Sequence, residues 1–503
     1  MELFHHLYVG FSVALSLTNL FYCFLGVFFG TLVGVLPGLG SPAAIALLLP
    51  ATFYMPPAGA FIMIAGIYYG AQYGGSTTSI LVNIPGEATA IVTCLDGYQM
   101  ARKGRAGPAL GISAFGSFVG GTLSVIGLML LGPFLARFAI RFGPPEYFSL
   151  MFLATVILTF LAKGSKVKSF ASALVGFLLD TVEIDYVSGT PHFALGTATL
   201  LKGIDMVPAA MGLFGVAEVF INLEQRLVRR DIFKDRIRGL LPTRKDWSES
   251  IGPMARGTVI GFLLGILPGS GAVMASFTSY AVEKRISREP DSFGRGAIAG
   301  VAGPETANNA ATGGALIPLL SLGIPTNAVT ALLLGAMMLH EIRPSPFLIR
   351  EHPQIFWSVV TSMYVGNVML LVLNLPLIGL WVRILKIPAR ILFPLILLFC
   401  LVGAYSAQND ASDVLIMLIF GVVGYFMQKA KFEPVLLIFA LIIGPLMENN
   451  FRKTLLISRG SFAIFFSRPI SAVLIVVSLL LLMAILFPRM RQRAALLGGQ
   501  DGT

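Results

Sequence analysis

Long apolar runs alternate along this chain with short breaks rich in Pro and Gly, and one kind of break occurs twice. The first apolar run ends at Gly34-Val-Leu-Pro-Gly-Leu-Gly40, and a later one ends at Gly265-Ile-Leu-Pro-Gly-Ser-Gly271. A new apolar run follows each break immediately. Pro and Gly inside a helix cost about 3 and about 1 kcal/mol relative to Ala. We therefore predict that one helix in each half of the chain is interrupted at these breaks.

A second motif follows each break. Ile84-Pro85-Gly86-Glu87-Ala88 in the first half corresponds to Ile324-Pro325-Thr326-Asn327-Ala328 in the second half, and a polar, Gly-rich stretch precedes each Ile-Pro. Backbone groups freed at bilayer depth are tolerated only where protein or an internal cavity satisfies them. Matching interruptions in two halves are typical of secondary transporters, whose substrate and ion sites lie where the two repeats meet.

The composition places these runs in a membrane. Of the 503 residues, 56% are hydrophobic and only 12% are charged, whereas soluble domains carry about 25% charged residues. The runs lack the alternation over about ten residues that marks a membrane β-barrel. The sequence therefore predicts an all-α, polytopic integral membrane protein with re-entrant hairpins and about 12–15 membrane segments, counting half-helices. The three cysteines are far apart and indicate neither a disulfide framework nor a metal site.

The distribution of charge predicts the topology. The first basic residue is Arg102, which favours an external N-terminus, and the net charge of +11 indicates basic cytoplasmic loops rather than nucleic-acid binding. If the spans are counted from an external N-terminus, the acidic loop over residues 180–185 lies outside. The same count predicts that the second broken helix runs opposite to the first, so that the repeats are inverted. Several basic residues fall outside in this count, against the general rule: Arg137, Arg141, Arg343, Arg350, Arg452 and Lys453.

This count also predicts the organisation of the chain. We expect a first repeat over residues 1–223 and a second over residues 257–488. A basic cytoplasmic linker over residues 224–256 would join them, because this is the one long hydrophilic stretch and it is rich in Arg and Lys. A basic cytoplasmic tail over residues 489–503 would follow the last span.

Neutral polar side chains fill the stretch before each Ile-Pro, and they predict a substrate site. Hydroxyls, amides and backbone N–H groups at helix N-termini suit an anion such as a carboxylate, while freed carbonyls suit Na⁺. The predicted substrate-binding residues are Ser76, Thr77, Thr78, Asn83, Thr306, Asn308, Asn309 and Thr312. The backbone predicted to face the substrate or its cation lies at Gly38, Gly40, Gly269, Gly271, Pro85 and Pro325. The alternative is that these small residues only let membrane helices pack closely; two matched stretches favour the site.

Three acidic residues lie in or beside these stretches. Intramembrane carboxylates are costly and usually functional, so Glu87 and Asp96 are candidates for proton-linked carboxylates. The alternative places both at a water interface near Arg102. Glu305 follows Gly-Pro, and we predict that it caps the start of a helix.

The sequence offers no enzyme motif. No Lys-Ser/Thr follows the glycine-rich breaks, Ser270 lacks the GxSxG context, and there is no HExxH. We therefore expect neither catalysis nor a cofactor. A channel is the alternative that stays open, because re-entrant hairpins also build pores. Channel filters usually carry rings of charges or carbonyls, whereas the polar groups here are neutral and lie in two unlike hairpins.

These motifs resemble those of the large membrane subunit, TctA, of tripartite tricarboxylate transporters. The resemblance rests on the break Gly34–Gly40, on Tyr73–Gly86, on Gly303–Ala310 and on Leu322–Pro325, and it covers about Leu17 to Phe487. His192 stands where an Arg is expected in the outer loop, and Thr326-Asn327 where Gly-Ser is expected.

The resemblance implies a bacterial inner-membrane carrier that imports a carboxylate, such as a tricarboxylate, by symport with Na⁺ or H⁺. It also implies two partners, a small membrane subunit (TctB-like) and a periplasmic solute-binding protein (TctC-like). A looser analogy with other ion-coupled carboxylate carriers implies a homodimer.

Overall fold

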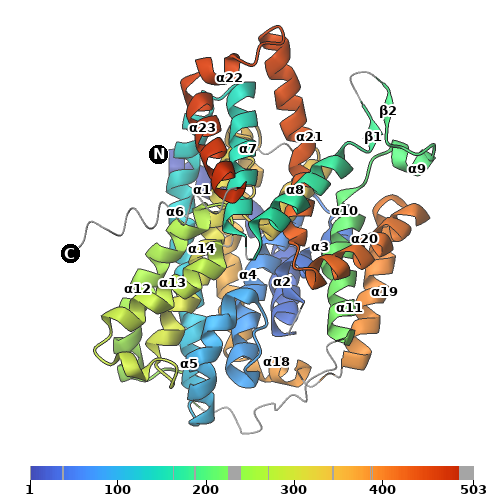
Figure 1. Ribbon diagram of the computed structural model, residues 1–503. Helices are drawn as coiled ribbons and strands as arrows, with labels where there is room; N and C mark the ends of the chain where they lie inside the picture. Colours follow the sequence, from blue (N-terminus) through green and yellow to red (C-terminus); the bar gives the residue numbers. More distant parts are fainter. Residues whose placement is uncertain are drawn as a thin grey trace. The chain divides into compact units, whose positions relative to one another are not determined.

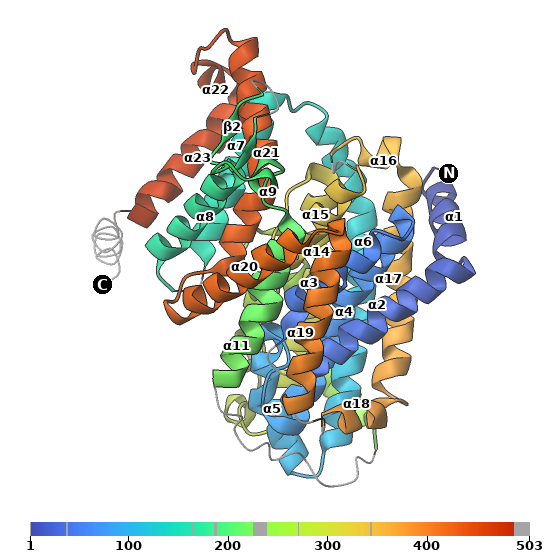
Figure 2. The ribbon, with the colours of Figure 1, turned by 90° about the vertical axis from the view of Figure 1, so that its right-hand side faces the viewer.

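The computed structural model describes residues 2–36, 39–162, 164–185, 189–224, 239–269, 271–342, 345–385, 387 and 389–486. These residues are almost entirely helical (Figures 1 and 2). The sheet found among them has two antiparallel strands, β1 (Glu183–Ile184) and β2 (Pro191–His192). Eight of the described helices are long and apolar enough to cross a membrane. The predicted all-α, polytopic membrane class is therefore confirmed.

The chain divides into two compact units. The first comprises Met1–Ala139, Val207–Leu267 and Gly271–Tyr425, and the second comprises Ile140–Met206, Pro268–Ser270 and Phe426–Thr503. Both predicted repeats contribute residues to each unit. The repeat boundaries that we drew from the sequence stay a prediction.

The first unit holds both interrupted helices. From the first half of the chain it contains α1 (Glu2–Ala14), α2 (Leu17–Val35), α3 (Gly40–Thr52), α4 (Pro57–Val82), η1 (Ala88–Ala90), α5 (Ile91–Arg102) and α6 (Ala106–Ala139). A connecting helix follows as α10 (Met206–Ala210), η2 (Met211–Val216) and α11 (Ala217–Glu224). From the second half it contains α12 (Arg244–Ile266), α13 (Gly271–Ile286), η3 (Pro290–Ser292), α14 (Ala299–Leu322), α15 (Ala328–Leu339), α16 (Leu348–Glu351), α17 (Pro353–Asn374), α18 (Ile378–Ile384), α19 (Ala389–Gln408) and most of α20 (Ala411–Lys429).

The second unit is smaller. It contains α7 (Pro144–Leu161), α8 (Lys166–Asp180), the two strands, α9 (Ala198–Leu201), α21 (Pro434–Ile457), α22 (Ile464–Ser467) and α23 (Pro469–Leu486). Within it α21 packs against α7 and α8, and α23 packs against α7. Arg468 forms an ion pair of 2.6 Å with the buried Glu146, which joins the start of α23 to the start of α7.

Both predicted interruptions are present. The first separates α2 from α3 between Val35 and Gly40, and the second separates α12 from α13 between Ile266 and Gly271. The polar stretches, however, are continuous parts of α4 and α14 rather than loops. Their backbone amides are therefore engaged within the helices. Tertiary packing overrides the weak helix propensity of Gly, Ser and Asn in these stretches.

The predicted linker is helical at its end. Residues 225–238 lie outside the described part of the chain, but residues 244–256 form the first half of α12. The helix starts there because Thr243 is its N-cap. The Thr243 hydroxyl accepts from the N–H of Asp246, and the Asp246 carboxylate accepts from the N–H of Thr243.

Glycines set the distance between the main helix pairs of the first unit. α2 packs against α4, and α12 packs against α14 (Figure 1). A Cβ at Gly30 would lie 2.4 Å from the carbonyl oxygen of Ile67, and a Cβ at Gly261 would lie 2.1 Å from that of Ala307. Such backbone contact is possible only without side chains. Glycine recurs at every fourth position on both faces: Gly26, Gly30 and Gly34 on α2, and Gly257, Gly261 and Gly265 on α12.

The two pairs share one packing register. The glycines of α2 contact Met63, Ile67 and Ala71 of α4, and those of α12 contact Gly303, Ala307 and Ala311 of α14. The alignment that matches Ile84 with Ile324 matches these two sets of partners position by position. The shared register supports the internal repeat that the sequence predicts.

Candidate functional site

Two polar stripes face each other between α4 and α14. The α4 stripe is Tyr68, Gln72 and Ser76, and the α14 stripe is Glu305, Asn308 and Thr312; all six side chains are buried. Spacings of three or four residues place each set on one helix face. The Ser76 hydroxyl donates to the Glu305 carboxylate, and Asn327, which follows α14, donates to the Tyr68 hydroxyl at 3.0 Å. A later residue of α4 thus meets an earlier residue of α14, so the helices run antiparallel here, in the sense that inverted repeats require.

The Glu305 carboxylate is the centre of this contact. It accepts hydrogen bonds from the hydroxyls of Ser76 and Thr93 and, at 3.2 Å, from the amide of Asn308. Its side chain is fully buried. Helix α14 begins earlier, at Ala299, so Glu305 lies inside the helix. Our prediction that Glu305 caps the helix start is therefore wrong. The Gly303-Pro304 pair misled that prediction, because Pro304 is itself accommodated within α14.

Asn309 extends the network from Glu305. Its amide nitrogen donates to the side-chain oxygen of Asn308 and, at 3.1 Å, to the backbone oxygen of Glu305. Its own side-chain oxygen is buried and has no hydrogen-bond partner among the described residues. Buried polar atoms are almost always paired in native proteins. An unpaired amide oxygen beside this cluster is therefore a natural contact for a polar ligand.

Other predicted ligands face elsewhere. The Thr78 hydroxyl donates to the backbone oxygen of Val35 at 2.7 Å, in the last turn of α2. The Thr306 hydroxyl bonds back to Ala302, and its oxygen lies 2.8 Å from the position of a Cβ at Gly116 on α6. Thr77 is buried in α4. The structure thus brings Ser76, Asn308, Asn309 and Thr312 together, while Thr78 and Thr306 contact neighbouring helices.

Asn83 occupies a helix end. It is exposed and has a left-handed backbone with φ of +57°, as the residue that ends α4. Asn is one of the few residues other than Gly that commonly takes this conformation. The geometry gives Asn83 a capping role, and its role as a ligand stays a prediction.

The first interruption holds a carboxylate at a helix start. Gly40, with φ of +65°, begins α3, and the Glu87 carboxylate accepts a hydrogen bond from the N–H of Ser41. An acidic group at this position stabilises the positive end of the helix dipole. Pro85 is half-buried in the loop between α4 and η1, where Glu87 also lies. Gly38 lies outside the described residues.

The second interruption differs in its surroundings. Gly271 begins α13, and Pro325 is buried between α14 and α15. Gly269 is assigned to the second unit and has φ of +129°. The residue that corresponds to Glu87 is Asn327, which caps α15 and donates to the Tyr68 hydroxyl at 3.0 Å.

Asp96 is held by backbone donors. Its carboxylate accepts from the N–H groups of Gly294, Gly296 and Ala297 at 2.7–2.9 Å and from the Tyr280 hydroxyl at 2.9 Å. The side chain is fully buried. This geometry anchors α5 to the loop that precedes α14.

The sequence analysis missed four members of the cluster. Tyr68 and Gln72 lie about two turns and one turn before Ser76, and the Gln72 side-chain oxygen accepts from the Thr89 hydroxyl at 2.5 Å. Thr93 on α5 donates to Glu305. The four-residue spacing of Tyr68, Gln72 and Ser76 is a signal that could have identified the α4 stripe. Thr89 and Thr93 gave no such signal, because they lie on separate elements.

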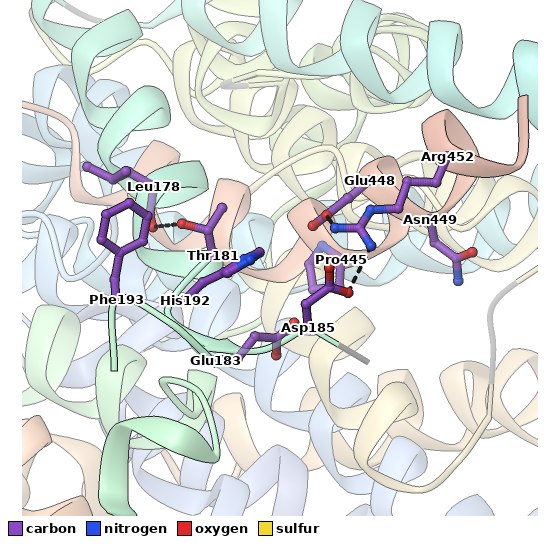
Figure 3. Close-up of a pocket in the computed structure, with 10 residues that line it drawn as sticks. All are labelled: Leu178, Thr181, Glu183, Asp185, His192, Phe193, Pro445, Glu448, Asn449 and Arg452. Carbon is purple, nitrogen blue, oxygen red and sulfur yellow. Dashed lines mark hydrogen bonds and ion pairs between the residues drawn. The ribbon is translucent and has the colours of Figure 1, made fainter. Parts of the chain in front are cut away.

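The second unit contains a pocket of about 390 Å³, shown in Figure 3. Arg452 lies between two acidic side chains there, forming ion pairs with Asp185 at 2.8 Å and with Glu448. Burial raises the pKa of Glu183, and the charges of Glu448 and Asp185 add to the effect. Arg452 was one of the exceptions to the charge rule, and its partner Asp185 belongs to the loop predicted outside. The ion pair explains how a basic residue is accommodated beside that loop.

The fold is that of a polytopic membrane protein, and the comparison with known families identifies a transport protein. Residues 20–439 match the family described as "Tripartite tricarboxylate transporter TctA family", and the chain belongs to this family. It is a subunit of a tripartite transporter, which implies other subunits, and the family points to transport rather than catalysis. With eight candidate spans, it is a multi-pass protein of the bacterial inner membrane, as predicted.

Two similar proteins come from Agrobacterium vitis. One, "Uncharacterized 52.8 kDa protein in TAR-I ttuC' 3'region", is 47% identical over 493 residues, which are 98% of this chain and 98% of that protein. The other, "Uncharacterized protein in TAR-II ttuC' 3'region", is 47% identical over 233 residues, which are 46% of this chain and 96% of that protein. No solved structure matches the chain.

Proposed function

We propose that this chain is the subunit that moves a carboxylate with two or three acidic groups into the cell, driven by a cation gradient. A periplasmic binding protein would deliver the solute, and a small membrane subunit would complete the complex. The family description names tricarboxylates. The observation that carries the proposal is the buried polar cluster between α4 and α14, the helices that pack against the two interrupted ones.

The chemistry of the cluster suits this substrate class. Amides and hydroxyls bind carboxylate oxygens without placing a fixed positive charge in the membrane, where such a charge is costly. Asn309 offers an unpaired oxygen for a substrate hydroxyl or carboxylic proton. Asn308 and Thr312 line the same helix face.

Uptake measurements test the proposal. Cells expressing the chain with its small subunit and binding protein should accumulate labelled citrate or a labelled C4 dicarboxylate. We expect saturable uptake that requires the binding protein, collapses with an ionophore and leaves the internal solute unmodified. Uptake that does not saturate and ignores the gradient would indicate a channel, and a modified internal solute would indicate an enzyme.

Substitutions at two asparagines then distinguish a role in substrate binding from a role in helix capping. Asn309→Ala should abolish uptake while the protein still inserts, because it removes the amide that links Asn308 to the Glu305 backbone. Asn83→Gly is the matched control, because Gly tolerates the left-handed conformation of Asn83. Normal uptake by Asn83→Gly would assign Asn83 to the helix cap. Normal uptake by Asn309→Ala would remove Asn309 from the site.

A further inference from the structure

The buried Glu305 carboxylate contacts three neutral side chains on α4, α5 and α14. We propose that Glu305 carries the coupling proton of the transport cycle, holding it between its Oε2 and the Ser76 hydroxyl. This inference rests on the proposed function and deepens it, because it commits the coupling cation to a proton and assigns it to one residue.

The first argument is charge. Ser76, Thr93 and Asn308 are the side chains that contact the Glu305 carboxylate, and all three are neutral. Within the described part of the chain, Glu305 has no ion pair or hydrogen bond with Lys, Arg or His. A buried ionised carboxylate without a cation costs several kcal/mol even after the surroundings relax. The resting state in a closed site is therefore the neutral acid.

The second argument is that both protonation states can be satisfied. When Glu305 is ionised, the hydroxyls of Ser76 and Thr93 and the amide of Asn308 donate to it. When it is protonated, its O–H donates to the Ser76 oxygen, and the Ser76 hydrogen turns to the Gln72 carbonyl, 3.4 Å away. A hydroxyl can donate one hydrogen bond and accept two. Ser76 can thus reverse its direction without leaving a group unpaired.

The third argument is contrast with the other acids around α14. Asp96 on α5 accepts from three backbone N–H groups, which can only donate, and from the Tyr280 hydroxyl. Glu283 on α13 forms a double hydrogen bond with Arg256 on α12 at 2.6 and 2.8 Å. Glu87, which precedes η1, accepts from the N–H of Ser41. The other titratable groups on helices packed against α14 are Tyr68, Tyr69, Tyr73, Cys94, Tyr98, Arg102, Arg137, Arg244, Lys245, Asp246, Glu249, Lys284, Arg285, Arg350 and Glu351. Among these acids, Glu305 has a donor set that can reverse.

The network also connects the proton to the predicted substrate residues. Asn308 donates to Glu305 Oε2 and accepts from Asn309. A proton on Oε2 reduces the negative charge that holds the Asn308 amide. One proton taken from water outside would change the site from −1 to neutral, and its release to water inside would restore the charge. Proton and substrate occupancy are therefore coupled through one pair of amides.

Transport assays give the first test. In the full complex, Glu305→Gln should lose citrate accumulation driven by a pH gradient but retain exchange of labelled for unlabelled citrate, because exchange requires no net proton movement. Ser76→Ala should shift the pH profile of uptake. Glu146→Gln is the matched control: it neutralises a buried glutamate of the second unit that is paired with Arg468, and accumulation should keep its pH dependence. Wild-type pH dependence in Glu305→Gln would overturn the proposal.

A second measurement does not depend on transport. Infrared difference spectra of the purified protein between low and high pH should show a carboxylic-acid band, sensitive to H/D exchange, that Glu305→Gln lacks. If the band persists in the variant, Glu305 is not the protonated group. Binding of radioactive Na⁺ by the wild type that disappears in Glu305→Gln would instead make it a sodium ligand and overturn the assignment to a proton. If the wild type takes up no carboxylate while the band is lost, the proposed function fails and the protonation of Glu305 stands.

Discussion

The two halves of the first unit can be compared at their interrupted helices. In the first half the acid is Glu87, in the loop after α4, where it holds the start of α3. In the second half the corresponding position is Asn327, which caps α15, and the acid is Glu305 inside α14. The glycine faces that fix the backbone are the same in both halves. Packing is thus repeated, while polar chemistry differs where α4 and α14 face each other.

This difference makes the two halves complementary. Ser76 of α4 supplies the hydroxyl that the Glu305 carboxylate requires. Under the alignment of Ile84 with Ile324, the counterparts of Ser76 and Glu305 are Leu316 and Ala65, both apolar. If the two halves had identical sequences, positions 65 and 305 would both be acidic or both be neutral. The divergence therefore leaves one buried acid with one set of donors.

The largest expected effect tests the shared packing. Gly30→Ala and Gly261→Ala each place a Cβ within 2.4 Å of a backbone carbonyl oxygen in the facing helix. Backbone cannot move aside as a side chain can, so we expect each change to cost about 3 kcal/mol or more, at the upper end of overpacking effects. Thermal unfolding in detergent measures the loss. Gly379→Ala is the control, because a Cβ there meets nothing within 4 Å.

The two glycine variants should behave alike. If Gly261→Ala unfolds the protein while Gly30→Ala leaves its thermal midpoint unchanged, the packing of the two halves is not equivalent. The conclusion that both halves share the same backbone packing would then be wrong.

A smaller effect tests the two loops after the polar helices. Glu87→Gln keeps the shape of the side chain but replaces the carboxylate that accepts from the N–H of Ser41 at the start of α3, and we expect a loss of about 0.5–1 kcal/mol. Asn327→Asp keeps a good N-cap for α15, so its cost should be smaller. Unfolding midpoints at neutral pH measure both. Equal losses would show that the carboxylate of Glu87 has no special role.

The sequence predicted backbone features better than side-chain partners. Pro-Gly breaks and glycine spacing are local signals, so the interruptions at Gly34–Gly40 and Gly265–Gly271 could be predicted. The apolar composition was enough for the fold class. Ser76 could be singled out as a candidate because it lies in a conspicuous polar stretch.

The pairing of Ser76 with Glu305 could not be predicted. The two residues are far apart in the sequence, and their contact depends on how α4 and α14 face each other. Thr93 reaches the same carboxylate from a third helix. Asn83 is ambiguous for a local reason: Asn serves both as an amide ligand and as a left-handed helix end. Only the backbone conformation distinguishes the two roles.

The smallest expected effect compares the starts of the two interrupted helices. α2 is capped by the neutral Ser16, whereas α12 is stabilised by Asp246, which pairs with Arg105. Burial alone would raise the pKa of Asp246, but hydrogen bonds from Thr243 and the charge of Arg105 outweigh it, and the pKa lies below its ordinary value. The folded protein therefore binds fewer protons than the unfolded chain in this range. Its stability rises with pH there.

The stabilisation by Asp246 should be complete above the unfolded pKa of about 4 and disappear as pH falls through the folded value. Asp246→Asn should cost about 0.5 kcal/mol at neutral pH and flatten the acid side of the stability profile. Ser16→Ala should lower stability by a similar amount at every pH, because no charge is involved. Thermal midpoints measured from neutral to acidic pH distinguish the two. A parallel pH profile in both variants would mean that the two helix starts are stabilised in the same way, despite their different caps.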